Sequence, residues 1–141
     1  MINFSRISGL ELAYLGDAVM ELFVREHLLE SGVCGTWALN HEALSYVKAT
    51  AQSAALENIL PHLTEEEMRV YKNARNCHTA AVPKSATVCQ YRRATGLEAL
   101  FAWLWLNDKK DRAKDLFYRA YRIGDYKNEP IIEEKDDEPT A

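Results

Sequence analysis

The sequence predicts an all-α fold, on three observations. Apolar residues recur at steps of three and four along most of the chain, which is the spacing of one face of a helix. Two of these segments open with a Ser/Thr-x-x-Glu capping box. The six glycines and four prolines stand mostly between the segments. Because no strand pattern and no internal repeat occurs, barrels, sandwiches and repeat arrays are poor candidates.

The first half of the chain contains two expected helices. The capping box of Ser8 and Glu11 opens the first, which is expected to run to about Glu30, where a Ser-Gly pair ends it. Thr36 is the expected N-cap of the second helix, which continues until Pro61 stops it.

Three further helices are expected in the second half. A capping box at Thr64 opens a helix to about Asn76, and a loop follows to Lys84. Residues 85–107 read as one long helix that is apolar on nearly all sides in its second half, and residues 112–123 as a final amphipathic helix.

Length and composition indicate one domain, residues 1–123, followed by an acidic tail, residues 124–141. The chain has 141 residues, of which 48% are hydrophobic and 27% charged. The tail has seven acidic residues and few apolar ones, so we expect it to be disordered. No 18-residue apolar run is present, and the first residues lack the basic and apolar regions of an export signal. We therefore expect a cytoplasmic protein without a membrane partner, whose three cysteines are reduced thiols.

The charge is unevenly distributed. The net charge is −4, yet the stretch from Met68 to Leu97 has six basic residues and no acidic one. We call these residues the basic band: Arg69, Lys72, Arg75, Lys84, Arg92 and Arg93. A local positive potential of this kind suits contact with a polyanion such as RNA, although each residue alone could be a solvated surface charge.

Two carboxylates stand alone in apolar helical runs. Asp17 is the only charge in residues 12–20 and Glu98 the only one in residues 97–106. A buried unpaired carboxylate costs several kcal/mol, so each needs a cation such as Arg25 or Arg92, a raised pKa, or a metal ion. If the two helices bring both carboxylates into one cleft, their hard oxygen ligands suit Mg²⁺.

Helical spacing adds two candidate residues that could hold these carboxylates in place. Glu21 follows Asp17 by one turn, and Thr95 precedes Glu98 by one turn. Either side chain could orient the carboxylate next to it, although for Glu21 a solvated helix carboxylate is the simpler interpretation.

Five blocks of residues resemble mini-ribonuclease III, the short bacterial form of the ribonuclease III endonuclease domain that has no double-stranded-RNA-binding domain. In order they are Leu-Ala-Tyr-Leu-Gly-Asp-Ala-Val at 12–19, Leu-Thr-Glu-Glu-Glu at 63–67, Arg75-Asn76, Pro83-Lys84, and Tyr91-Arg92-x-x-Thr95-x-x-Glu98-Ala99-Leu100. The resemblance covers roughly residues 8–123. It implies a helical bundle of the ribonuclease III endonuclease type.

The resemblance also implies an activity and a site. It implies a Mg²⁺-dependent endoribonuclease that acts on double-stranded RNA, with a stem of the 23S ribosomal RNA precursor as substrate and a homodimer as the active form. Asp17 and Glu98 take the positions of catalytic metal ligands. Ala13 and Thr95 stand at the other two positions that are acidic in longer ribonuclease III proteins, and mini-ribonuclease III is similar to this chain in that respect.

One alternative belongs to another class of protein. Asp17 and Glu98 could each pair with a buried cation in a non-catalytic helical dimerisation module, whose basic band binds RNA or an acidic protein. Dependence on a divalent ion separates the two hypotheses, because only a carboxylate site is stabilised by Mg²⁺.

Overall fold

The computed structural model describes residues 1–77 and 86–135, and all regular structure in these residues is helical, which confirms the expected all-α class. The helices are α1 (Gly9–Glu30), α2 (Thr36–Val47), α3 (Ala49–Glu57), α4 (Glu65–Arg75), α5 (Val88–Leu106) and α6 (Lys110–Ala120), with 3-10 turns at Phe4–Arg6, Leu60–His62 and Gly124–Tyr126. Within the described ranges, no helix is long and apolar enough to cross a membrane.

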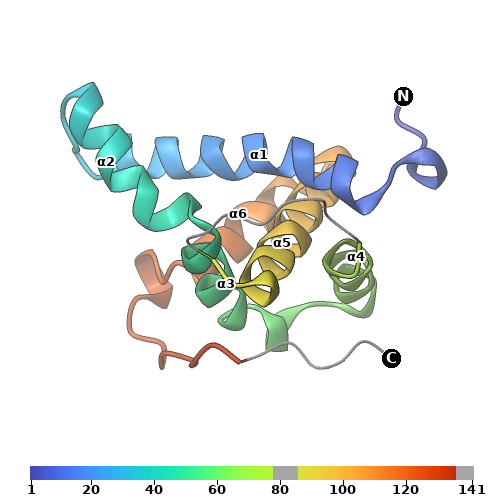
Figure 1. Ribbon diagram of the computed structural model, residues 1–141. Helices are drawn as coiled ribbons and strands as arrows, with labels where there is room; N and C mark the ends of the chain where they lie inside the picture. Colours follow the sequence, from blue (N-terminus) through green and yellow to red (C-terminus); the bar gives the residue numbers. More distant parts are fainter. Residues whose placement is uncertain (78–85, 136–141) are drawn as a thin grey trace.

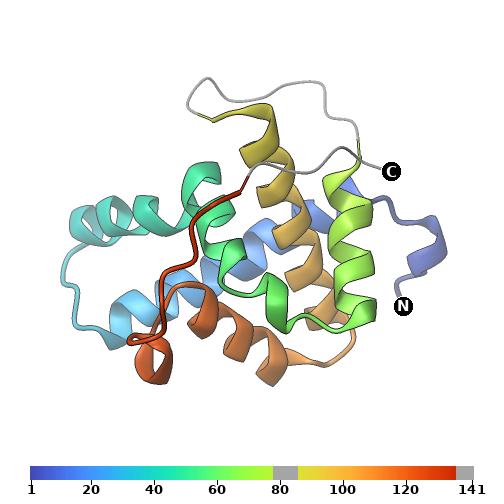
Figure 2. The same cartoon turned by 90° about the horizontal axis from the view of Figure 1, so that it is seen from below.

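Helix α5 runs through the middle of the domain. In Figure 1 it passes beneath α1, with α3 on one side and α4 on the other, and Figure 2 shows the same order from below. Its main neighbours are α1, α4 and α3. This central position explains why the second half of α5 is apolar on several sides.

Both expected capping boxes are present. The Ser8 hydroxyl accepts a hydrogen bond from the backbone N–H of Glu11, whose carboxylate accepts one from the Ser8 N–H. Thr64 and Glu67 make the same reciprocal pair at the start of α4. These bonds satisfy backbone donors that have no partner within the helix.

The expected second helix is wrong in two respects. Thr36 is its first residue rather than its N-cap, which is Gly35 and makes no side-chain capping bond. The chain also bends at Lys48. Its ψ of 145° is extended, so α2 ends there and α3 begins with the next residue. Helix α2 packs on α1 whereas α3 packs on α5, and a single straight helix cannot reach both. The apolar spacing continues across the bend and therefore gave no sign of it. A smaller difference concerns α6, which begins at Lys110, two residues before the expected start.

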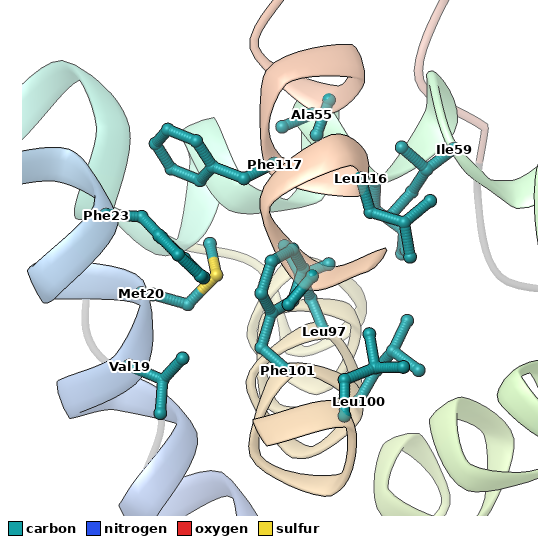
Figure 3. Close-up of a cluster of buried hydrophobic side chains, with 14 of the residues drawn as sticks. Val19, Met20, Phe23, Ala55, Ile59, Leu97, Leu100, Phe101, Leu116 and Phe117 are labelled. Carbon is teal, nitrogen blue, oxygen red and sulfur yellow. The ribbon is translucent and has the colours of Figure 1, made fainter. Parts of the chain in front are cut away.

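The main core lies where α1, α3, α5 and α6 meet (Figure 3). Phe23 of α1 packs against Phe101 of α5 and Phe117 of α6, with ring centroids 6.1 and 5.5 Å apart. Met20, Leu97 and several neighbours are fully buried beside them. Each such side chain stabilises the fold by about 1.5–3 kcal/mol, so this cluster anchors α1 on α5.

Residues 124–135 contact the domain, which differs from the free tail expected from composition. Arg119 forms an ion pair with Glu129 at 3.2 Å, and the Ser53 hydroxyl donates to the Glu134 carboxylate at 2.6 Å. Composition alone did not indicate that polar groups of the domain would hold this segment. Residues 136–141 lie outside the described residues, so disorder remains a prediction for them.

Candidate active site

The two lone carboxylates lie on helices that touch at their main chains. A Cβ atom built on Gly16 of α1 would lie 1.7 Å from the carbonyl oxygen of Glu98 on α5. Only a residue without a side chain allows this approach. Because Asp17 follows Gly16 directly, the crossing places the Asp17 side chain next to that of Glu98.

The Asp17 side chain lies close enough to the Glu98 side chain to influence its protonation. Asp17 is exposed on α1, whereas Glu98 is partly buried beneath it. Burial, together with the charge of Asp17 and the hydrogen bond to it, raises the pKa of Glu98 to about 9. At neutral pH and without a cation, the Glu98 carboxyl group is therefore protonated, because its charged form is disfavoured by burial and by the neighbouring carboxylate.

The donor set of this pair fits a divalent cation. A bound cation compensates both charges and lets both carboxylates ionise, and carboxylate oxygens are the ligands that Mg²⁺ prefers. No group of three or more His, Cys, Asp or Glu side chains suited to a metal occurs in the described residues. A metal here would have two protein carboxylates and would keep several water ligands.

The cation pairing considered for these carboxylates is not observed. Among the described residues, no ion pair joins Asp17 or Glu98 to a lysine or arginine. Arg25 instead pairs with Glu21 at 3.0 Å on the surface of α1. Among the described residues the carboxylate pair therefore has no cationic partner, which leaves the raised pKa of Glu98 or a bound metal ion to compensate for the burial of its charge.

Glu21 and Thr95, the two candidates for holding the carboxylates in place, form hydrogen bonds with other groups. The Glu21 carboxylate is bound to Arg25, so the simpler interpretation of Glu21 fits the structure. Thr95 is buried, and its hydroxyl donates to the Tyr91 carbonyl of the same helix at 3.0 Å. The hydrogen bonds described for these two side chains go to Arg25 and Tyr91, not to Asp17 or Glu98.

Part of the basic band forms an exposed face on α4. Arg69 and Lys72 are exposed, and the Arg75 guanidinium lies over the Tyr71 ring at 5.6 Å. Arg92 on α5 is partly buried. Lys84 lies outside the described residues.

Arg93 was wrongly expected at this face. It is 3% exposed and pairs with Glu57 of α3, and its Nε donates to the Ser53 hydroxyl at 2.8 Å. The reason is its position on α5, which faces α3 rather than solvent. Arg93 therefore stabilises the interior and does not contact a polyanion.

Two residues near the site, Gly16 and Tyr121, were not among the predicted site residues. A glycine in a helix interior costs about 1 kcal/mol relative to alanine, so Gly16 within Leu-Gly-Asp was a readable signal of close approach. Tyr121 gave no such signal. Its hydroxyl donates to the Tyr46 carbonyl at 2.6 Å, and burial, followed by the charges of Glu98 and Tyr46, raises its pKa.

Comparison with known proteins agrees with this fold and site. Residues 10–109 match the model of the ribonuclease III domain. A mini-ribonuclease 3 of Symbiobacterium thermophilum is 45% identical over 120 residues, which cover 85% of this chain and 92% of that protein. A mini-ribonuclease 3 of Enterococcus faecalis is 38% identical, over 82% of this chain and 89% of the relative. A crystal structure of a Fusobacterium nucleatum protein superposes with a TM-score of 0.72 at 38% identity, over 79% of this chain and 89% of that one.

These matches show that the helical domain is a ribonuclease III domain, and the chain is an endoribonuclease of that family. Within the family it belongs to the mini-ribonuclease III group. The non-catalytic alternative is therefore set aside.

Proposed function

We propose that this endoribonuclease hydrolyses phosphodiester bonds of double-stranded RNA with Mg²⁺ held by Asp17 and Glu98. The observation that carries the proposal is the adjacent carboxylate pair at the crossing of α1 and α5, which lacks a cationic partner among the described residues. When bound, Mg²⁺ supplies activation of water and neutralisation of charge on the phosphate. The protein's part is to hold both carboxylates in one place and to bring the RNA backbone to them.

The exposed face of α4 is proposed to hold the RNA by its phosphates. Arg69, Lys72 and Arg75 lie on one helix that packs directly on α5, which carries Glu98. Such contacts place the backbone without reading bases, and A-form RNA is recognised mainly by its shape and its phosphates. Lys84 and Arg92 are proposed as further contacts in the same band.

The proposed natural substrate is a stem in the precursor of 23S ribosomal RNA. This follows from the resemblance of the site-bearing blocks to mini-ribonuclease III. A ribosomal RNA precursor is a cytoplasmic substrate in bacteria, so we propose a cytoplasmic location as well.

We further propose that the enzyme acts as a homodimer. The outer face of α1 exposes Tyr14 (86% exposed), Leu22 and Leu29, and continues into exposed Leu44 of α2. A groove of about 590 Å³ lies between these two helices. Because an apolar face of this kind favours a partner and begins at Tyr14, one turn before Asp17, a second copy would cover it next to the site. Sedimentation of Tyr14→Glu should show monomers where the wild type shows dimers; a monomeric wild type would contradict the proposal.

A direct assay tests the proposed reaction. A labelled RNA hairpin is incubated with the protein, with Mg²⁺ or with EDTA, beside a single strand of the same length. We expect discrete cuts in the duplex only with Mg²⁺. Cleavage in EDTA, or equal cleavage of the single strand, would contradict the proposal.

A further inference from the structure

The main chains of α1 and α5 touch at Gly16, next to the proposed metal site. A Cβ built on Gly16 would lie 1.7 Å from the carbonyl oxygen, 2.3 Å from the carbonyl carbon and 2.9 Å from the Cα of Glu98. All three atoms belong to the main chain. A side chain can rotate away from a clash, but main-chain atoms inside a helix cannot, so any side chain at position 16 forces the two helices apart.

The contact lies directly beside both carboxylates. Gly16 is bonded to Asp17, and the atom that it meets belongs to Glu98 itself. Non-bonded atoms need more than 3 Å, so a methyl group at position 16 requires the crossing to open by more than about 1 Å. That movement separates the Asp17 carboxyl group from the Glu98 carboxyl group.

We propose that Gly16 is a positioning residue, whose missing side chain sets the distance between the Asp17 and Glu98 carboxyl groups and thereby the affinity for Mg²⁺. The proposal rests on the proposed role of these carboxylates as metal ligands. Mg²⁺ is sensitive to such a shift, because it demands a near-ideal octahedron with oxygens at about 2.0–2.1 Å.

A second tight glycine contact provides a matched control. A Cβ on Gly9, two turns earlier in α1, would lie 2.6 Å from the Cα of Ala74 on α4. Gly9→Ala therefore strains α1 against a main chain as Gly16→Ala does, but at a crossing that involves neither carboxylate. The two variants share the loss of packing and differ in the movement of the ligands.

The test compares Gly16→Ala with Gly9→Ala and the wild type, using Mg²⁺ alone and no RNA. Melting temperatures are measured over a Mg²⁺ titration, because a ligand that binds the folded state stabilises it by an amount that grows with the ratio of its concentration to its dissociation constant. Both variants should melt lower in EDTA. Only Gly16→Ala should also bind Mg²⁺ at least about tenfold more weakly and lose about 100-fold in kcat, which is the effect of a misplacement near 1 Å. Equal Mg²⁺ affinity of the two variants would overturn the proposal.

Glu98→Asp keeps the inference testable if Gly16→Ala does not fold. Shortening the side chain withdraws the carboxyl group by about 1.5 Å, the length of one carbon–carbon bond, while the helix crossing stays intact. Its Mg²⁺ affinity should fall by a similar factor, and an affinity within about twofold of the wild type would overturn the proposal.

Asp17→Asn distinguishes a failure of the proposed metal site from a failure of the positioning role of Gly16. If Asp17→Asn binds Mg²⁺ as the wild type does, the proposed site is wrong; if only Asp17→Asn loses binding, the positioning role alone is wrong.

Discussion

The Arg93 guanidinium and the Glu57 carboxylate form an ion pair inside the domain, between α5 and α3, with side chains only 3% and 5% exposed. The Ser53 hydroxyl accepts from Arg93 and donates to Glu134, so the buried pair is also linked to the C-terminal segment. A basic residue that the sequence placed in an RNA-binding band thus holds the central helix against its neighbour.

Removing Arg93 should destabilise the fold strongly. Arg93→Met leaves the Glu57 carboxylate buried without its cation, which typically costs about 3–5 kcal/mol. Arg25→Met breaks the exposed pair with Glu21 and should cost no more than about 1 kcal/mol. Urea unfolding of both variants measures the difference, and losses of equal size would contradict the structural role of Arg93.

Glu98 should make the metal-free protein less stable as the pH rises. Its pKa in the fold is about 9, above its ordinary value of 4.5, so the folded state favours the protonated carboxyl group. The stabilisation from this group is complete below pH 4.5 and is lost as the pH rises toward 9. Glu98→Gln cannot titrate at this position. In EDTA, urea unfolding should show that the advantage of Glu98→Gln over the wild type grows between pH 5 and pH 9. A constant difference would mean that the pKa of Glu98 is not raised.

The exposed face of α4 should bind RNA without regard to sequence. Arg69→Ala with Lys72→Ala removes two proposed phosphate contacts and should weaken binding to every duplex, while lowering the salt dependence by up to about two contacts. Lys110→Ala with Lys114→Ala makes the same change of charge on α6 and serves as the control. Filter binding over a salt series distinguishes them. A loss confined to one RNA sequence would indicate base reading instead.

Deleting residues 125–141 should have two effects. The segment has seven acidic residues, and a tethered polyanion competes with RNA for the basic band at low salt, where screening is weak. RNA binding should therefore tighten at low ionic strength and change little at high salt, with kcat unaltered. Loss of the Arg119–Glu129 and Ser53–Glu134 contacts should also lower the melting temperature. Equal RNA affinity of both forms at low salt would show that the tail does not compete.

The sequence predicted the helices and the two carboxylates because each has a local cause. Capping at Ser8 and Thr64 is decided within one turn, and a lone charge in an apolar run is visible without any tertiary contact. The bend at Lys48 and the burial of Arg93 could not be predicted in this way. Both depend on which helix lies opposite, and the apolar spacing of a segment does not contain that information.

Asp17→Asn tests the central claim most directly, because it removes one ionised ligand while keeping the size and shape of the side chain. The measurement is Mg²⁺-dependent cleavage of a labelled double-stranded RNA hairpin, with the melting temperature in EDTA as a control for folding. The account predicts a folded variant that neither cuts the duplex nor is stabilised by Mg²⁺. A folded Asp17→Asn protein that keeps more than a trace of Mg²⁺-dependent cleavage would contradict it.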